Sequence, residues 1–226
     1  MSNQPQKIRL NKFLAERLGI SRREADGLIS AGKIKVDNQT AILGTRIDSK
    51  SKVLNNKKIV PFDNEYIYIA FHKPVGYVCS RRAQGGTPTI YGLLPKKYHH
   101  LKTVGRLDKD SSGLILLTND GDFAFQMTHP KFRKTKVYEV ELDHALEPLH
   151  QQIISDFGVM LDDGPSQFKV IHNNNDYIVT LTEGRNRQIR RTFAALGYHV
   201  TKLHRTTFGP YELGGLQSGK CAIIEP

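Results

Sequence analysis

One aspartate with an arginine two residues before it precedes an apolar run, in the segment GRLDKDSSGLILLTNDG (residues 105–121). The run at residues 114–117 predicts a short buried strand, and the Asn-Asp-Gly after it predicts a turn. The carboxylate of Asp108 must stay solvated or find a cation, because burial of an unpaired charge is costly. Arg106 is close enough in sequence to be that cation. Taken alone, however, solvated loop charges before a strand explain this segment more simply than a reactive carboxylate does.

A second group of side chains that could do chemistry is the arginine-rich segment EGRNRQIRR, residues 183–191. It predicts the start of a helix whose apolar positions are Ile189, Phe193 and Leu196. Arg187, Arg190 and Arg191 are spaced i, i+3 and i+4, so we expect one basic face beside the apolar stripe. Charges of one sign repel each other, which makes such a face unusual unless it binds phosphate or carboxylate groups.

A tyrosine lies on a predicted strand between these two segments. Residues 137–142, VYEVEL, alternate so that Tyr138, Val140 and Leu142 share one face. Tyr138 is therefore directed toward the apolar side of the strand. On this strand alone, a core tyrosine with a hydrogen-bonded hydroxyl and a tyrosine that faces a ligand both remain open.

The elements that must position these residues fall into two units. Residues 7–60 contain two predicted helices and a strand, and Ser21 with Glu24 forms a capping box for the second helix. Residues 61–65 have the composition of a linker, and residues 66–226 contain strands with interspersed helices. Four basic residues gather around the second helix and the strand after it: Arg22, Arg23, Lys33 and Lys35. A solvated face would also explain them, but their concentration in so small a unit favours phosphate contacts.

The charge of the chain is uneven. Of the net charge of +11, residues 1–64 carry 13 Lys and Arg against 6 Asp and Glu, and the other 162 residues carry 20 against 16. A concentrated positive field favours a polyanionic partner, because each neutralised phosphate releases condensed counterions. Nucleic acid is therefore expected rather than a membrane surface, for which the first helix lacks an aromatic face.

Other bulk features exclude several classes of protein. Two cysteines are too few for a disulfide framework or a cysteine-based zinc site. The sequence has no apolar run near the ~20 residues of a membrane span. The N-terminus has no apolar region of the secretory kind. We therefore expect a cytoplasmic protein without membrane attachment.

Five motifs occur in one order: SRREAD..I..GKIKVDN, HKPVGYVCS, GRLDKDSSGLILLTNDG, K.YEVEL and EGRNRQIRR...LGYHVTKLHR. Together they resemble the RsuA family of ribosomal-RNA pseudouridine synthases, from about residue 8 to residue 216. The resemblance implies an α+β fold. A small S4-type α/β RNA-binding domain at residues 7–60 would precede a catalytic domain at residues 66–226, built on a mixed, largely antiparallel sheet flanked by helices.

The resemblance also implies roles for individual residues. Asp108 matches the catalytic aspartate, Tyr138 the tyrosine that packs against the target base, and Arg190 the basic residue that pairs with the aspartate. The residues expected to line or support the substrate pocket are Arg106, Leu203, Lys73, Arg185 and Arg187. The residues expected to bind RNA outside the pocket are Arg22, Arg23, Lys33, Lys35 and Arg191.

The chemistry of these enzymes suits such residues. Isomerisation of uridine breaks the N1–C1′ bond, turns the base and rejoins it through C5, so that no metal or other cofactor is expected. The aspartate could act as a nucleophile or as a base toward the C2′ proton, and either role needs an ionised carboxylate. The nucleotide must leave its stack to reach a pocket. The expected partner is ribosomal RNA, as a single strand or stem-loop or within a pre-ribosomal particle, bound by a monomer.

Two other functions are open to the first unit. A non-catalytic RNA-binding or ribosome-assembly protein would explain residues 1–64 equally well, but not the placement of GRLD and RQIR. An S4-linked RNA methyltransferase would need a glycine-rich strand-to-helix turn, which the sequence lacks. The motifs favour a target uridine in the large-subunit (23S) RNA over one in the small-subunit (16S) RNA.

Overall fold

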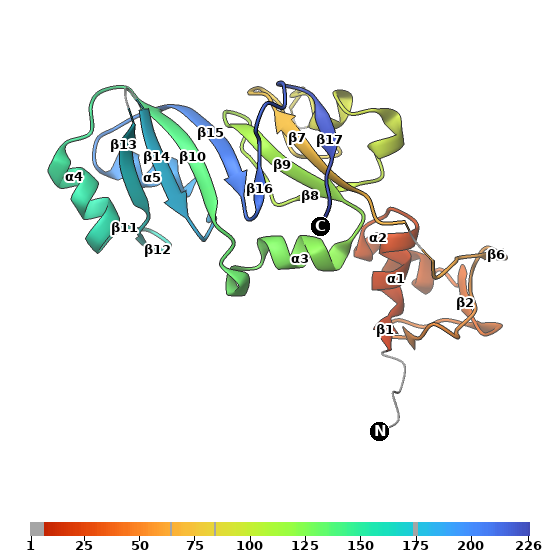
Figure 1. Cartoon of the computed structure of the whole chain (residues 1–226). Helices are drawn as coiled ribbons and strands as arrows, with labels where there is room; N and C mark the ends of the chain where they lie inside the picture. Colours follow the sequence, from red (N-terminus) through yellow and green to blue (C-terminus); the bar gives the residue numbers. More distant parts are fainter. Residues whose placement is uncertain (1–6, 64, 84, 174–175) are drawn as a thin grey trace. The chain divides into compact units, whose positions relative to one another are not determined.

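The computed structural model describes residues 7–63, 65–83, 85–173 and 176–226, which separate into two compact units. The first unit runs up to Ile67 and includes Asn119–Gly121, and the second contains Tyr68–Thr118 and the chain from Asp122 onward (Figure 1). The predicted linker at residues 61–65 includes Asn64, which lies outside the described residues.

The first unit has two helices, α1 (Leu10–Arg17) and α2 (Arg22–Ser30). The predicted capping box of α2 is confirmed. The hydroxyl of Ser21 accepts a hydrogen bond from the Glu24 amide at 3.1 Å, and the Glu24 carboxylate accepts one from the Ser21 amide at 2.7 Å. These two bonds satisfy backbone donors that a helix start otherwise leaves unpaired.

Short strands complete the first unit: β1 (Ile8–Arg9), β2 (Ile34–Val36), β3 (Gln39–Thr40), β4 (Arg46–Ile47), β5 (Val53–Asn55) and β6 (Lys58–Ile59). Strands β3-β2-β5-β6 form one antiparallel sheet, and β1 pairs with β4. Asp37 and Asn38 join β2 to β3 with positive φ values of 51° and 70°, as tight hairpin turns require. Buried residues such as Phe13, Ala25 and Ile34 fill its core.

The second unit is built on a mixed sheet in the order β13-β14-β10-β15-β9-β7-β17, with β16 on β15 and β8 on β9 (Figure 1). Its strands are β7 (Tyr68–Lys73), β8 (Lys102–Val104), β9 (Ser112–Thr118), β10 (Lys136–Leu142), β13 (Lys169–Asn173), β14 (Asp176–Leu181), β15 (Val200–Phe208), β16 (Tyr211–Glu212) and β17 (Cys221–Ile223). Only β15 and β9 pair in parallel among its described strand pairs. The predicted mixed, largely antiparallel sheet is confirmed.

Helices and a hairpin flank this sheet: η1 (Ile90–Gly92), η2 (Lys96–Tyr98), α3 (Gly121–Thr128), η3 (Pro130–Phe132), α4 (Pro148–Gln152), η4 (Ile153–Phe157), α5 (Gln188–Ala195) and the hairpin of β11 (Val159–Leu161) with β12 (Gly164–Ser166). The predicted helix after EGRNR begins at Gln188, with Ile189 and Phe193 buried as expected.

The parallel pairing of β9 and β15 joins the two halves of the sheet. Gly113 of β9 lies opposite Arg205 of β15, with a positive φ of 107°. A Cβ atom on Gly113 would overlap the Arg205 backbone, so only glycine fits this close approach. The loop that carries Asp108 leads directly into this junction.

Candidate active site

A cavity of about 580 Å³ lies in the second unit, where the loop before β9, strands β10 and β15 and the segment before α5 meet. Six of the predicted site residues line it: Arg106, Asp108, Tyr138, Arg185, Arg187 and Leu203. Lys73, Arg190 and Arg191, which were predicted from the sequence with them, are not among its lining residues.

Asp108 lies in the loop between β8 and β9, and about a third of its side chain is exposed. The Nη1 of Arg187 is 3.5 Å from Asp108 Oδ2. Arg187 also donates two hydrogen bonds of 3.0 Å to the two carboxylate oxygens of Asp110. Such a two-pronged pair fixes the plane of a guanidinium. The arrangement places the carboxylate of Asp108 beside a cation in the cavity wall.

The expected direct pair between Arg190 and Asp108 is wrong in this structure. Arg190 donates to the carbonyl oxygens of Val200 at 2.7 Å and Asp110 at 2.8 Å, and its Nε lies 3.3 Å from the Asp110 carboxylate. Arg190 lies in the first turn of α5, whereas Arg187 precedes the helix with a left-handed backbone (φ 46°) and lines the cavity. Arg190 therefore holds the loop of Asp108 through Asp110.

Asp110 is a site residue that the sequence reasoning missed. Its partial burial alone would raise its pKa, but hydrogen bonds from Arg187 and the charges of Arg190 and Arg187 hold the pKa below the usual carboxylate value. The signal that could have found it is the second aspartate two residues after Asp108 in GRLDKD. An ionised Asp110 keeps Arg187 beside Asp108.

Tyr138 forms the apolar side of the cavity together with Leu203. Both side chains are buried. The Tyr138 hydroxyl accepts a hydrogen bond of 3.4 Å from Nη1 of Arg205, and the Arg205 guanidinium lies 5.9 Å from the centroid of the tyrosine ring. Tyr138 is therefore both a hydrogen-bonded tyrosine and a residue that lines the cavity, so the two alternatives left open by the strand pattern are combined.

Arg205 is a second functional candidate that was not singled out, although it closes the KLHR motif. Only 2% of it is exposed, and its Nε donates to the carbonyl oxygen of Leu114 at 2.8 Å. Its guanidinium also lies 4.8 Å from the ring centroid of Phe208. A buried cation between two aromatic rings strengthens the positive potential of the cavity wall.

Lys73 is fully buried and does not line the cavity, so of the two roles expected of it, lining or supporting the pocket, only support remains. Its Nζ donates to the carbonyl oxygens of Ser111 at 2.6 Å and Pro74 at 3.0 Å. Burial lowers the pKa of Lys73 to about 8. Because Lys73 ends β7 and Ser111 precedes β9, this side chain supports the Asp108 loop from inside the fold. Its role is support rather than contact with a substrate.

Lys136 is a further cation in the cavity wall. Its Nζ donates to the carbonyl oxygen of Glu183 at 3.3 Å and lies 5.4 Å from the ring centroid of Phe208. Burial, together with the nearby charge of Arg205, lowers the pKa of Lys136 to about 8. The sequence motif K.YEVEL contained it, but nothing in the motif placed it at the cavity.

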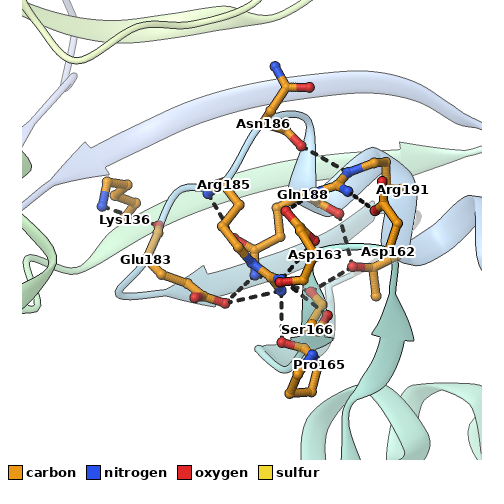
Figure 2. Close-up of polar contacts among 12 residues, drawn as sticks. Lys136, Asp162, Asp163, Pro165, Ser166, Glu183, Arg185, Asn186, Gln188 and Arg191 are labelled. Atoms are coloured by element: carbon orange, nitrogen blue, oxygen red, sulfur yellow. Dashed lines mark hydrogen bonds and ion pairs between the residues drawn. The ribbon is translucent and has the colours of Figure 1, made fainter.

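The expected single basic face on α5 is also wrong, because Arg185 and Arg191 point toward the β11–β12 hairpin (Figure 2). Arg185 reaches Asp163 at 2.8 Å and the carbonyl oxygen of Pro165 at 2.8 Å, and Arg191 reaches Asp163 at 2.7 Å and also pairs with Asp162. Arg185 and Arg191 thus pair with acidic residues of the hairpin, whereas Arg187 and Arg190 pair with Asp110. In this structure Arg191 is paired with carboxylates.

The four predicted RNA-binding residues of the first unit are exposed: Arg22, Arg23, Lys33 and Lys35. Arg22 donates to the side-chain oxygen of Asn11 at 3.2 Å. Across the described ranges, no cluster of three or more His, Cys, Asp or Glu side chains is arranged to hold a metal ion. No described helix has the length and apolar character needed to cross a membrane.

Comparison with known proteins gives matches over most of the chain. Residues 67–195 match the family model described as RNA pseudouridylate synthase, and residues 8–53 match the model of the S4 domain.

Curated relatives and a solved structure agree. The chain is 36% identical over 218 residues to "Ribosomal large subunit pseudouridine synthase B" of Salmonella typhi, covering 91% of this chain and 75% of that protein. It is 36% identical to an uncharacterized RNA pseudouridine synthase of Mycobacterium bovis, covering 99% and 92%. A crystal structure of a pseudouridylate synthase matches with a TM-score of 0.69 at 30% identity, covering 96% of both chains.

Proposed function

The chain belongs to the RNA pseudouridylate synthase family, and we propose from this that it converts one specific uridine of large-subunit ribosomal RNA to pseudouridine. The observation that carries the proposal is the cavity that Asp108 and Tyr138 both line, in which Arg187 lies 3.5 Å from the Asp108 carboxylate. The large-subunit target rests on the similarity to "Ribosomal large subunit pseudouridine synthase B", whose printed name specifies that subunit.

In the proposed reaction Asp108 is the reactive group. It attacks the nucleoside as a nucleophile or removes the C2′ proton as a base, and both roles need the carboxylate charge that Arg187 stabilises. The ring of Tyr138 packs against the uracil after the base has left its stack. Leu203 supplies the apolar contact beside it. The detached base turns, rejoins the same sugar through C5 and then loses its C5 proton, so the side chains must hold the base while it turns and leave that proton a path to water.

The remaining proposed roles separate capture of RNA from chemistry. The exposed cations of the first unit bind phosphates, and Arg106 contacts the RNA at the cavity. We propose that the protein acts in the cytoplasm as a monomer, on free ribosomal RNA or on a pre-ribosomal particle.

Pseudouridine mapping of both ribosomal RNAs from a strain without this gene tests the function. We expect one large-subunit uridine to lose its modification, with rescue by the wild-type gene and none by Asp108→Asn. A lost site in the small-subunit RNA would overturn the proposed subunit, and unchanged maps of both RNAs would overturn the activity.

A further inference from the structure

The end of α3 and the short helix η3 lie on the path from α3 to β10 (Figure 1). This segment carries a cluster of exposed aromatic and basic side chains. We call it the aromatic platform, and it consists of Phe125, His129, Lys131, Phe132 and Arg133. Phe125 is 45% exposed and Phe132 is 38% exposed. Large rings at such exposure retain apolar surface that a ligand could still cover.

The rings of the platform pack against one another. The centroids of Phe125 and His129 are 4.6 Å apart, and those of Phe125 and Phe132 are 5.8 Å apart with the ring planes at 90°. The Nζ of Lys131 lies 4.6 Å from the ring centroid of Phe132 and 5.2 Å from that of Phe125. The aromatic faces already attract a cation in the absence of RNA.

The backbone beneath the platform is well fixed. The ring nitrogen Nδ1 of His129 accepts a hydrogen bond of 3.2 Å from the Lys131 amide and so caps η3. Pro130 restricts the first position of η3, and Arg133 ends it in a left-handed conformation (φ 46°). Rings held on a fixed backbone lose little freedom when a planar ligand stacks on them.

The platform borders the cavity. Thr128 and Pro130 line the cavity wall, and in the chain they alternate with the platform residues His129 and Lys131. One short stretch of chain therefore contributes both to the cavity and to the exposed aromatic surface beside it.

The charge of this stretch fits a polyanion. Residues 125–134, FQMTHPKFRK, contain three Lys and Arg and no Asp or Glu. Aromatic rings interleaved with cations are the arrangement by which proteins bind unpaired nucleotides, with bases on the rings and phosphates on the cations. A protein-binding surface would have fewer lysines at its centre.

We propose that the aromatic platform stacks one or more unpaired bases of the RNA that flank the target uridine. This inference rests on the proposed function, since the platform would hold the strand from which the uridine is turned into the cavity. Lys131 and Arg133 would bind the phosphates of the same nucleotides.

Tryptophan fluorescence offers a direct test, because the chain contains no tryptophan. A Phe132→Trp variant of the full chain is titrated with a single-stranded dodecamer of uridine, and with an abasic oligomer of the same length and charge. We expect quenching by the uridine dodecamer and little by the abasic oligomer, because only bases stack on the indole. Phe157→Trp is the matched control, since Phe157 is 74% exposed in η4 and does not line the cavity. Its fluorescence should change little with either oligomer.

Equal quenching by both oligomers, or quenching by neither, would overturn the proposal. A spectral response to anionic phosphatidylglycerol vesicles, with none to the uridine dodecamer, would also overturn it and identify a membrane contact.

Kinetics separate this inference from the proposed function. With unmodified ribosomal RNA labelled with 5-tritiated uridine, Phe125→Leu combined with Phe132→Leu should raise KM about tenfold and leave kcat unchanged, whereas Phe157→Leu should alter neither. An active wild-type protein whose KM does not respond to the double variant would overturn the platform alone. Quenching of Phe132→Trp by RNA in a protein that releases no tritium would support the platform and contradict the proposed function.

Discussion

The arginines before and within α5 divide into two pairs that face different acidic partners. Arg187 and Arg190 reach Asp110 beside the cavity, and Arg187 also lies 3.5 Å from Asp108. Arg185 and Arg191 reach the β11–β12 hairpin, chiefly through Asp163. The first pair adjoins the carboxylate assigned to the reaction, and the second holds a surface hairpin to the helix.

This difference shows that the role of an arginine depends on which carboxylate it pairs with. All four cations come from seven consecutive residues, and spacing alone predicts one basic face for three of them, Arg187, Arg190 and Arg191. The fold gives the arginines different partners, because it brings both the loop of Asp110 and the β11–β12 hairpin next to α5. Substitutions in the first pair should therefore change the chemical step, and substitutions in the second should change stability.

The largest predicted contrast between the pairs is in the rate of the chemical step. Arg187→Gln and Arg190→Gln should each lower the single-turnover rate at saturating enzyme by about 10²-fold, as loss of one preorganised cation at a site does. Arg191→Gln should lower it less than about tenfold. Tritium release from 5-tritiated uridine in ribosomal RNA measures all three rates. An Arg191 variant slower than the other two would contradict the division.

The cations of the first unit should affect capture of RNA and leave the chemical step unchanged. A variant with Arg22, Arg23, Lys33 and Lys35 all changed to glutamine should bind ribosomal RNA roughly 10- to 100-fold more weakly at low salt. The slope of log affinity against log salt should become less steep by about 3, because each of the four lost phosphate contacts contributes about 0.7 to that slope. Filter binding measures both. A slope equal to that of the wild type would place RNA capture elsewhere.

Loss of the ion pairs made by Arg185 and Arg191 should lower the thermal stability of the protein. Asp163→Asn removes the carboxylate shared by Arg185 and Arg191, so Tm should fall modestly, as expected for exposed ion pairs. The single-turnover rate should stay within about threefold of wild type, because the carbonyl oxygens of Gly164 and Pro165 still hold Arg185 in the cavity wall. Thermal denaturation followed by circular dichroism measures Tm. The exposed Asp156→Asn, in η4, controls for loss of any single surface charge. A large rate loss with unchanged Tm would assign the hairpin a catalytic role.

The smallest predicted effect is a pH dependence from Lys73. Burial lowers its pKa to about 8, so between pH 8 and its unfolded value the unfolded chain binds more protons than the folded one. Its contribution to the free energy of unfolding therefore rises with pH over this range. Lys73→Met should remove that rise, which urea unfolding at pH 7 to 10 measures. An equal slope in the variant and the wild type would show that Lys73 does not titrate there.

Local features of the fold could be predicted from the sequence because their causes lie within a few residues. The capping box of Ser21 and Glu24 needs only a spacing of three, and the buried face of Tyr138 needs only strand alternation. The motif order also placed Asp108 at the cavity, through resemblance to a family rather than through physical derivation.

The partners of the cations could not be predicted in this way, because they are distant in sequence. Arg187 and Asp110 are 77 positions apart, and Arg205 and Tyr138 are 67 apart. Helical spacing predicts from which side of the helix an arginine side chain projects. Its ion-pair partner depends on how β9, β15 and α5 pack together. The left-handed backbone of Arg187 adds a change of direction that no helical pattern contains.

The two aspartates of the GRLDKD loop provide the most direct test of the account, because they share one loop and one arginine but differ in proposed role. Single-turnover tritium release at saturating enzyme compares Asp108→Asn with Asp110→Asn, and RNA binding by each variant is measured alongside. We predict that Asp108→Asn lowers the rate at least ~10⁴-fold with RNA binding intact, as loss of a reacting group does. Asp110→Asn, which only loosens Arg187, should lower it about 10- to 100-fold. Equal losses, or a larger loss at Asp110, would contradict the assignment of Asp108 as the reactive carboxylate.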